Sequence, residues 1–130
     1  MIVIDASVIL EVLLAGAGSP AVEDRIFSRK ETLHAPHSID LEVVQVLRRY
    51  AASKDMTAQR GLEAITDFLD LPITRYPHDM FVPRIWELRH NITAYDAAYV
   101  ALAEALSAPL LTRDARLASS SRHHAKIELI

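Results

Sequence analysis

The sequence predicts an α/β fold in which helices cover both faces of a central parallel sheet of about five strands. Short apolar runs alternate with amphipathic segments along the chain, which is the pattern of parallel strands joined by helices. The 130 residues, 51% hydrophobic and 24% charged, suit one domain, residues 1–130, with a buried core. Ligands of such folds bind beyond the carboxyl ends of the strands, so residues at those ends are the first candidates for a site.

Strands and helices are expected in alternation. Strands are expected at short apolar runs, many of them rich in β-branched residues, at 2–5, 32–37, 71–77, 108–114 and 126–130. Helices are expected where apolar residues recur with helical spacing, at 7–15, 21–29, 38–53, 57–70, 79–91, 93–107 and 114–121. Gly16, Gly18 and Pro20 are expected to end the first helix. Ser38 and Thr57 are expected N-caps, and Pro83 breaks the helix that contains it.

The composition excludes several kinds of site. The chain has no cysteine, so it can form no disulfide, thiolate zinc site or cysteine nucleophile. Its net charge of −3 provides no global attraction to nucleic acid, although metal ions and local arginines can still hold phosphate. Dinucleotide-binding and P-loop motifs are absent from the sequence. No secretory signal and no apolar run of ~18 residues is visible, so we expect a cytoplasmic protein without a membrane partner.

Two aspartates occupy equivalent places in the predicted sheet. Asp5 follows the apolar run IVI, Asp114 follows PLLT after one arginine, and each precedes a predicted helix. Helix N-capping explains either aspartate on its own. Because the carboxyl ends of parallel strands meet at one edge of a sheet, the pair also indicates a site at that edge.

Two further acids lie on predicted helices. Asp96 is in the first turn of the helix 93–107, which has so few polar positions that we expect it to be central and buried. Thr93 precedes Asp96 in the spacing of a capping box, but a carboxylate in such a helix needs a hydrogen bond, an ion pair or a cation. Glu42 borders an apolar stripe of its helix, and the simplest interpretation of its side chain is a solvated residue at the edge of that stripe. That stripe consists of Ile39, Val43, Val46 and Tyr50.

Convergence of these four acids would create a site for a divalent cation. Their mutual repulsion would raise at least one pKa, and a cation removes that cost. Mg²⁺ and Mn²⁺ prefer all-oxygen ligands, and such a site suits phosphoryl chemistry. Two alternatives stay open: a metal-dependent phosphatase or phospho-acceptor domain, and a non-catalytic binding module whose acids only cap helices. A phosphatase with a D-x-D motif is disfavoured because Ser7, not an acid, lies two residues after Asp5.

The four acids lie in segments with a recognisable pattern. The segments are IVIDASV, LEVVQVLRR, TAYDAAYVALAEAL and LLTRDARLA. Together they resemble the PIN domain, and most of all the VapC toxins of bacterial toxin–antitoxin pairs, over residues 1 to about 118. The resemblance implies a three-layer α/β/α PIN-like fold and a Mg²⁺- or Mn²⁺-dependent endoribonuclease that a small antitoxin holds inactive.

The resemblance also implies a role for each matching residue. The catalytic and metal-binding acids would be Asp5, Glu42, Asp96 and Asp114, and the supporting hydroxyls would be Ser7 and Thr112. Arg113 departs from the family pattern, since many members have an uncharged residue there. Contacts to RNA are expected at Arg49, Arg89 and Arg113.

The resemblance implies partners as well. They are an RNA substrate and a VapB-like antitoxin, and we also expect a homodimer. One apolar group in the sequence could serve a protein partner: Met80, Phe81, Ile85 and Trp86. We expect most of these four in the core, with a dimer or antitoxin surface as the alternative.

Overall fold

Within residues 1–28 and 30–130, which the computed structural model describes, five strands form one sheet. The strands are β1 (Ile2–Ile4), β2 (Leu33–Pro36), β3 (Ile73–Tyr76), β4 (Leu110–Thr112) and β5 (Ile127–Leu129). Their order is β3-β2-β1-β4-β5, and every neighbouring pair is parallel. The predicted parallel sheet of about five strands is confirmed.

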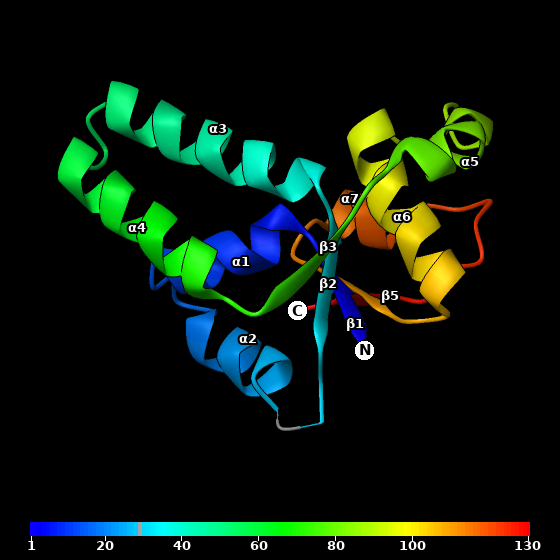
Figure 1. Cartoon of the computed structure of the whole chain (residues 1–130), viewed down its shortest axis with the longest axis horizontal. Coiled ribbons are helices and arrows are strands. Elements are labelled where there is room, and N and C mark those ends of the chain that lie inside the picture. Colours follow the sequence, from blue (N-terminus) through cyan, green and yellow to red (C-terminus); the bar gives the residue numbers. More distant parts are fainter. Residues whose placement is uncertain (29) are drawn as a thin grey trace.

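Helices cover both faces of this sheet. They are α1 (Ala6–Leu13), α2 (Ser19–Ile26), α3 (Ser38–Ala52), α4 (Ala58–Asp70), α5 (Val82–Glu87), α6 (Ala94–Leu106) and α7 (Ala115–Ala118), with the 3-10 turn η1 (Asp79–Phe81) before α5. Figure 1 shows α1 to α4 on one side of the strands and α5 and α6 on the other. The three layers confirm the predicted α/β/α architecture.

The helix α6 is the buried helix that its apolar sequence predicts. Its residues 97–103 are all buried, and it contacts β1, β2 and β4. The run is rich in alanine, so the helix can lie close to the strands. After α6 the chain turns at Ser107, which has a positive φ of 49°, and enters β4. Because β4 is parallel to its neighbours, this return places the start of α6 at the carboxyl ends of the strands.

Some predicted helix ends are wrong. Pro20 does not end a helix but lies in the first turn of α2, where its missing N–H breaks no helical hydrogen bond. Ser38 is not the N-cap of α3, because His37 occupies that position. Pro83 also lies in the first turn of its helix, so the predicted break falls between η1 and α5. Thr57 is the N-cap of α4, as predicted.

The exposure of apolar side chains also departs from the predictions. Met80 and Trp86 are each 67% exposed, whereas Phe81 and Ile85 pack against the core. Tyr50 is 39% exposed and does not belong to the buried stripe of α3. That stripe consists of Ile39, Val43 and Leu47.

The second predicted helix is shorter than expected, and the structure also bears on membrane crossing. The helix predicted over residues 21–29 ends at Ile26, and residue 29 itself lies outside the described residues. Across the described ranges, no helix combines the length and the hydropathy that crossing a bilayer requires.

Candidate functional site

Asp5 stands directly after β1 and caps α1. Its Oδ1 accepts hydrogen bonds from the backbone N–H of Val8 at 3.1 Å and from Oγ of Ser7 at 2.5 Å. Its Oδ2 accepts a hydrogen bond from the hydroxyl of Thr112, at the end of the neighbouring strand β4. The side chain is therefore more than a helix cap, since it also joins the ends of two strands.

The two hydroxyls are oriented toward Asp5 by the backbone that follows β4. Ser7 Oγ accepts from the N–H of Arg113 at 3.0 Å, and Thr112 Oγ1 accepts from the N–H of Asp114 at 3.0 Å. Each hydroxyl oxygen accepts a hydrogen bond from a backbone N–H, so its own O–H is free to donate to the carboxylate. The supporting role predicted for Ser7 and Thr112 thus corresponds to specific contacts.

Burial dominates the electrostatics of Asp5. The residue is 7% exposed, and burial raises the pKa of its carboxyl group. The hydrogen bonds from Ser7, Thr112 and Val8 oppose this rise, and the nearby negative charge of Asp96 adds to it. A carboxylate has about four acceptor positions, and three are used here, so one position on Oδ2 is left.

Asp96 and Asp114 line a common cleft of about 480 Å³ at the carboxyl edge of the sheet. Thr93 caps α6 by accepting the N–H of Asp96 at 3.2 Å, and Asp114 caps α7 by accepting the N–H of Arg116 at 2.8 Å. Burial raises the pKa of Asp96, and the charge of Asp114 raises it further. The cleft is lined by Arg89, His90, Asn91, Ile92, Thr93, Asp96, Asp114, Arg116 and Leu117.

Glu42 is half-buried and paired with Tyr99 of α6. The tyrosine hydroxyl donates a hydrogen bond to Oε2 of Glu42. Burial raises the pKa of Glu42, the Tyr99 hydrogen bond opposes the rise, and the charges of Asp96 and Asp5 add to it. Burial and the carboxylate of Glu42 also raise the pKa of Tyr99, so its phenol stays protonated and remains the donor.

The four acids therefore influence one another. Asp96 affects the pKa of both Asp5 and Glu42, and Asp114 affects that of Asp96. Asp5 and Glu42 do not line the cleft that Asp96 and Asp114 share. In the described part of the chain, no three acidic or histidine side chains come close enough to form a ready-made metal cage. The carboxylate oxygens of these acids nevertheless fit Mg²⁺, because that ion binds through only one or two carboxylates and keeps several waters.

The predicted RNA-contacting arginines lie in different surroundings. Arg89 lines the cleft. Arg113 is held away from it, since its Nη1 donates to the carbonyl of Ile130 at 3.2 Å and its Nε lies 3.5 Å from Oε2 of Glu11. Arg49 is exposed on α3, two turns or about 10 Å along the helix from Glu42.

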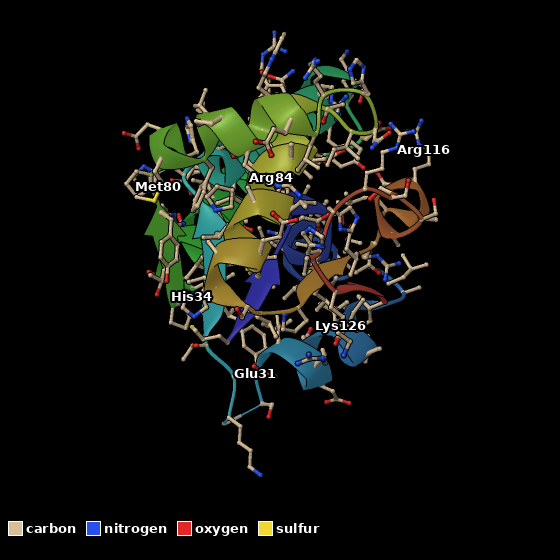
Figure 2. All side chains as sticks on the ribbon, turned by 90° about the vertical axis from the view of Figure 1, so that its right-hand side faces the viewer. Glu31, His34, Met80, Arg84, Arg116 and Lys126 are labelled. Atoms are coloured by element: carbon tan, nitrogen blue, oxygen red, sulfur yellow. The ribbon has the colours of Figure 1, made fainter. Side chains whose placement is uncertain are left out.

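Two residues of the site were not selected from the sequence. Arg116 lines the cleft, and Figure 2 shows it extending from α7 beside the loop that joins α5 to α6. Tyr99 follows Asp96 by three residues, a spacing that places both on one face of a helix. That spacing was the available signal for Tyr99, while Arg116 had none beyond its nearness to Asp114.

Comparisons with known proteins agree with this geometry. The family model of the PIN domain matches residues 2–122. The chain is 43% identical to the ribonuclease VapC12 of Mycobacterium tuberculosis, over all of this chain and 99% of that protein. Two solved structures share the fold. VapC20 of M. tuberculosis, a sarcin–ricin loop cleaving toxin, has a TM-score of 0.70 and 16% identity over 92% of this chain and 94% of its own. VapBC2 from Rickettsia felis, bound to a promoter DNA fragment, has a TM-score of 0.72 and 14% identity over 99% and 98%.

Proposed function

Because the chain belongs to the PIN-domain family, we propose that it is a VapC-type endoribonuclease, the toxin of a toxin–antitoxin pair. The observation that carries the proposal is the buried carboxylate of Asp5, which two hydroxyls hold beside the charge of Asp96. A purely structural cap would not need a second and third donor or a neighbouring acid that raises its pKa.

Asp5 and Asp96 are the proposed holders of a Mg²⁺ or Mn²⁺ ion. Glu42 and Asp114 complete the acidic site directly or through water. Such a cation, when bound, lowers the pKa of a coordinated water and offsets the charge that develops on the scissile phosphate. The raised pKa values of Asp5, Glu42 and Asp96 favour this assignment, because burial, with neighbouring negative charge adding to it, disfavours the charged carboxylates, and a bound cation would offset that cost.

The protein itself supplies orientation and charge. Ser7 and Thr112 keep the Asp5 carboxylate in one position, and Tyr99 does the same for Glu42. Glu42 and Asp114 orient the attacking water, and in-line attack leaves a 5′-phosphate and a 3′-hydroxyl. Fixed carboxylates reduce the reorganisation that the reaction requires.

Local arginines are the proposed contacts to the RNA backbone. Arg89 and Arg116 line the cleft, and Arg49 extends the positive charge along α3. For Arg113 we propose a lesser role, because Glu11 and the carbonyl of Ile130 engage its guanidinium. RNA binding should weaken with salt, since phosphate contacts release counterions.

A VapB-like antitoxin and a second copy of the chain are the proposed protein partners. Exposed apolar side chains on α3 and around α5 provide surface for them. These side chains are Leu41, Val44, Met80 and Val82.

The test is RNA cleavage by protein purified free of antitoxin. Structured RNA is incubated with Mg²⁺ or with EDTA. We expect cleavage in Mg²⁺ alone, and loss of cleavage in Asp5→Asn and Asp96→Asn. Asp67→Asn, on the exposed face of α4, is the matched control and should cleave normally. Cleavage that persists in EDTA, or in both site variants, would refute the mechanism.

A further inference from the structure

Trp86 and Arg89 form an exposed pair at the rim of the acidic cleft. Trp86 is 67% exposed, and Cζ of Arg89 lies 4.5 Å from the centre of its ring. Nη1 of Arg89 also donates to the carbonyl of Trp86 at 2.9 Å, which keeps the guanidinium over the ring. The exposed indole ring and the guanidinium beside it offer flat faces on which a planar group can stack.

A second, mostly apolar pocket adjoins this pair. Its volume is about 290 Å³, near the lower end of pockets that hold small ligands. Arg89, Ile92 and Thr93 line both this pocket and the acidic cleft, so the two lie side by side. The pocket is lined by Val82, Ile85, Trp86, Arg89, Ile92, Thr93 and Ala94.

We propose that this pocket is a base-binding subsite, in which an unpaired nucleobase of the RNA stacks on Trp86 and Arg89. The inference rests on the proposed ribonuclease function. Unpaired bases stack on aromatic rings and on guanidinium planes, and both are present here. The adjoining phosphate then lies toward the cleft, where Arg89 and Arg116 complement its charge.

The charge of the site favours a nucleobase over a protein side chain. A nucleotide joins a flat apolar group to an anion, and the structure joins an apolar pocket to a cleft in which Arg89 and Arg116 lie beside the carboxylates of Asp96 and Asp114. The two arginines can pair with a phosphate, and the two carboxylates are the residues that a bound cation would neutralise. The subsite would therefore select RNA in which a base next to the cleaved bond is unpaired.

Trp86 is the only tryptophan of the chain, so its fluorescence reports on this subsite alone. The probe is a short single-stranded RNA of mixed sequence, added in EDTA so that no cleavage occurs. We expect the RNA to quench Trp86 and the same RNA with abasic positions to quench it much less. Fully paired duplex RNA should resemble the abasic probe.

Variants of Trp86 test the stacking geometry. Trp86→Leu keeps an apolar side chain without a flat ring, and we expect it to weaken binding of labelled single-stranded RNA by about 5- to 150-fold. KM for cleavage should rise in parallel, with kcat little changed. Trp86→Phe should retain most of the affinity. Leu69→Ala on α4 is the control, because Leu69 is 65% exposed and lies outside both pockets.

Four results would overturn the inference, the last of them by cleavage. One is equal quenching by intact and abasic RNA, and the second is unchanged RNA affinity in Trp86→Leu. The third is a Trp86 variant that binds RNA normally but loses self-association or antitoxin binding, which would assign the surface around Trp86 to a protein partner. Wild-type protein that cleaves no RNA in Mg²⁺ refutes the proposed function. Normal cleavage by both wild type and Trp86→Leu refutes the subsite alone.

Discussion

Replacing Thr112 by valine should destabilise the fold, because it removes two hydrogen bonds while the side chain keeps nearly the same shape. Thr112 is fully buried, its hydroxyl donates to Asp5, and the same oxygen accepts the N–H of Asp114. Losing a hydrogen bond to a charged group costs about 1.5–3 kcal/mol, and an unpaired buried amide costs about 1–3 kcal/mol. Because Asp114 is only half-buried, we expect about 1 kcal/mol for its amide, and a total of about 2.5–4 kcal/mol.

The cost of Thr112→Val should depend on pH in a defined direction. The hydroxyl lowers the pKa of Asp5, so its removal raises the folded-state pKa beyond the rise that burial already causes. A group whose pKa is raised on folding loses its contribution to stability as pH rises through the folded-state pKa. The variant should therefore lose most free energy of unfolding near pH 7, and less near pH 4, because the raised folded-state pKa of Asp5 makes its carboxylate take up a proton as the pH falls.

Urea unfolding followed by far-UV circular dichroism measures this effect. Thr66→Val is the matched control, because the Thr66 hydroxyl is exposed and donates only to the carbonyl of Leu62 within α4. We expect the control to stay within about 0.5 kcal/mol of wild type. A loss below about 1 kcal/mol for Thr112→Val, or an equal loss at both pH values, would refute the reasoning.

Four further predictions follow from other contacts. Asp96→Asn should raise the unfolding temperature in EDTA, because it removes a carboxylate that burial and the charge of Asp114 disfavour in the folded protein. The same variant should abolish stabilisation by Mg²⁺. Tyr99→Phe should raise the pKa of Glu42 and move the acid limb of the pH–activity profile to higher pH. Burial lowers the pKa of His34, so the free energy of unfolding measured with urea should fall as pH drops below about 6.5, by at most about 1.4 kcal/mol per pH unit, and His34→Gln should flatten that slope. Arg116→Ala should raise KM and make the salt dependence of RNA binding shallower.

Local chemistry explains the predictions that the structure confirms. The strands at β1 and β4 follow from short apolar runs, and α6 follows from a run of alanine, valine and leucine with few polar positions. Asp5 and Asp114 could be placed because each directly precedes a helix, and N-capping needs only the next three residues. Features of this kind depend on neighbours in the sequence.

Predictions failed where packing overrides local preference. Ser38 is a good N-cap by type, but the chain enters α3 one residue earlier, and Ser38 Oγ is buried without a hydrogen bond among the described residues. Trp86 is hydrophobic enough for the core, yet it is exposed beside Arg89. The residues within one turn of helix therefore predict neither the start of α3 nor the exposure of Trp86.

The sequence by itself determined the order of strands and helices, the parallel sheet and the acids that end its strands. Tertiary structure alone decided that Thr112 meets Asp5 and that Tyr99 meets Glu42, since these partners lie 107 and 57 residues apart. It also decided that Arg116 faces the cleft while Glu11 and Ile130 hold Arg113. The physical reason is that periodicity and capping are set by residues a few positions apart, whereas the position of a side chain in a site depends on how distant segments pack.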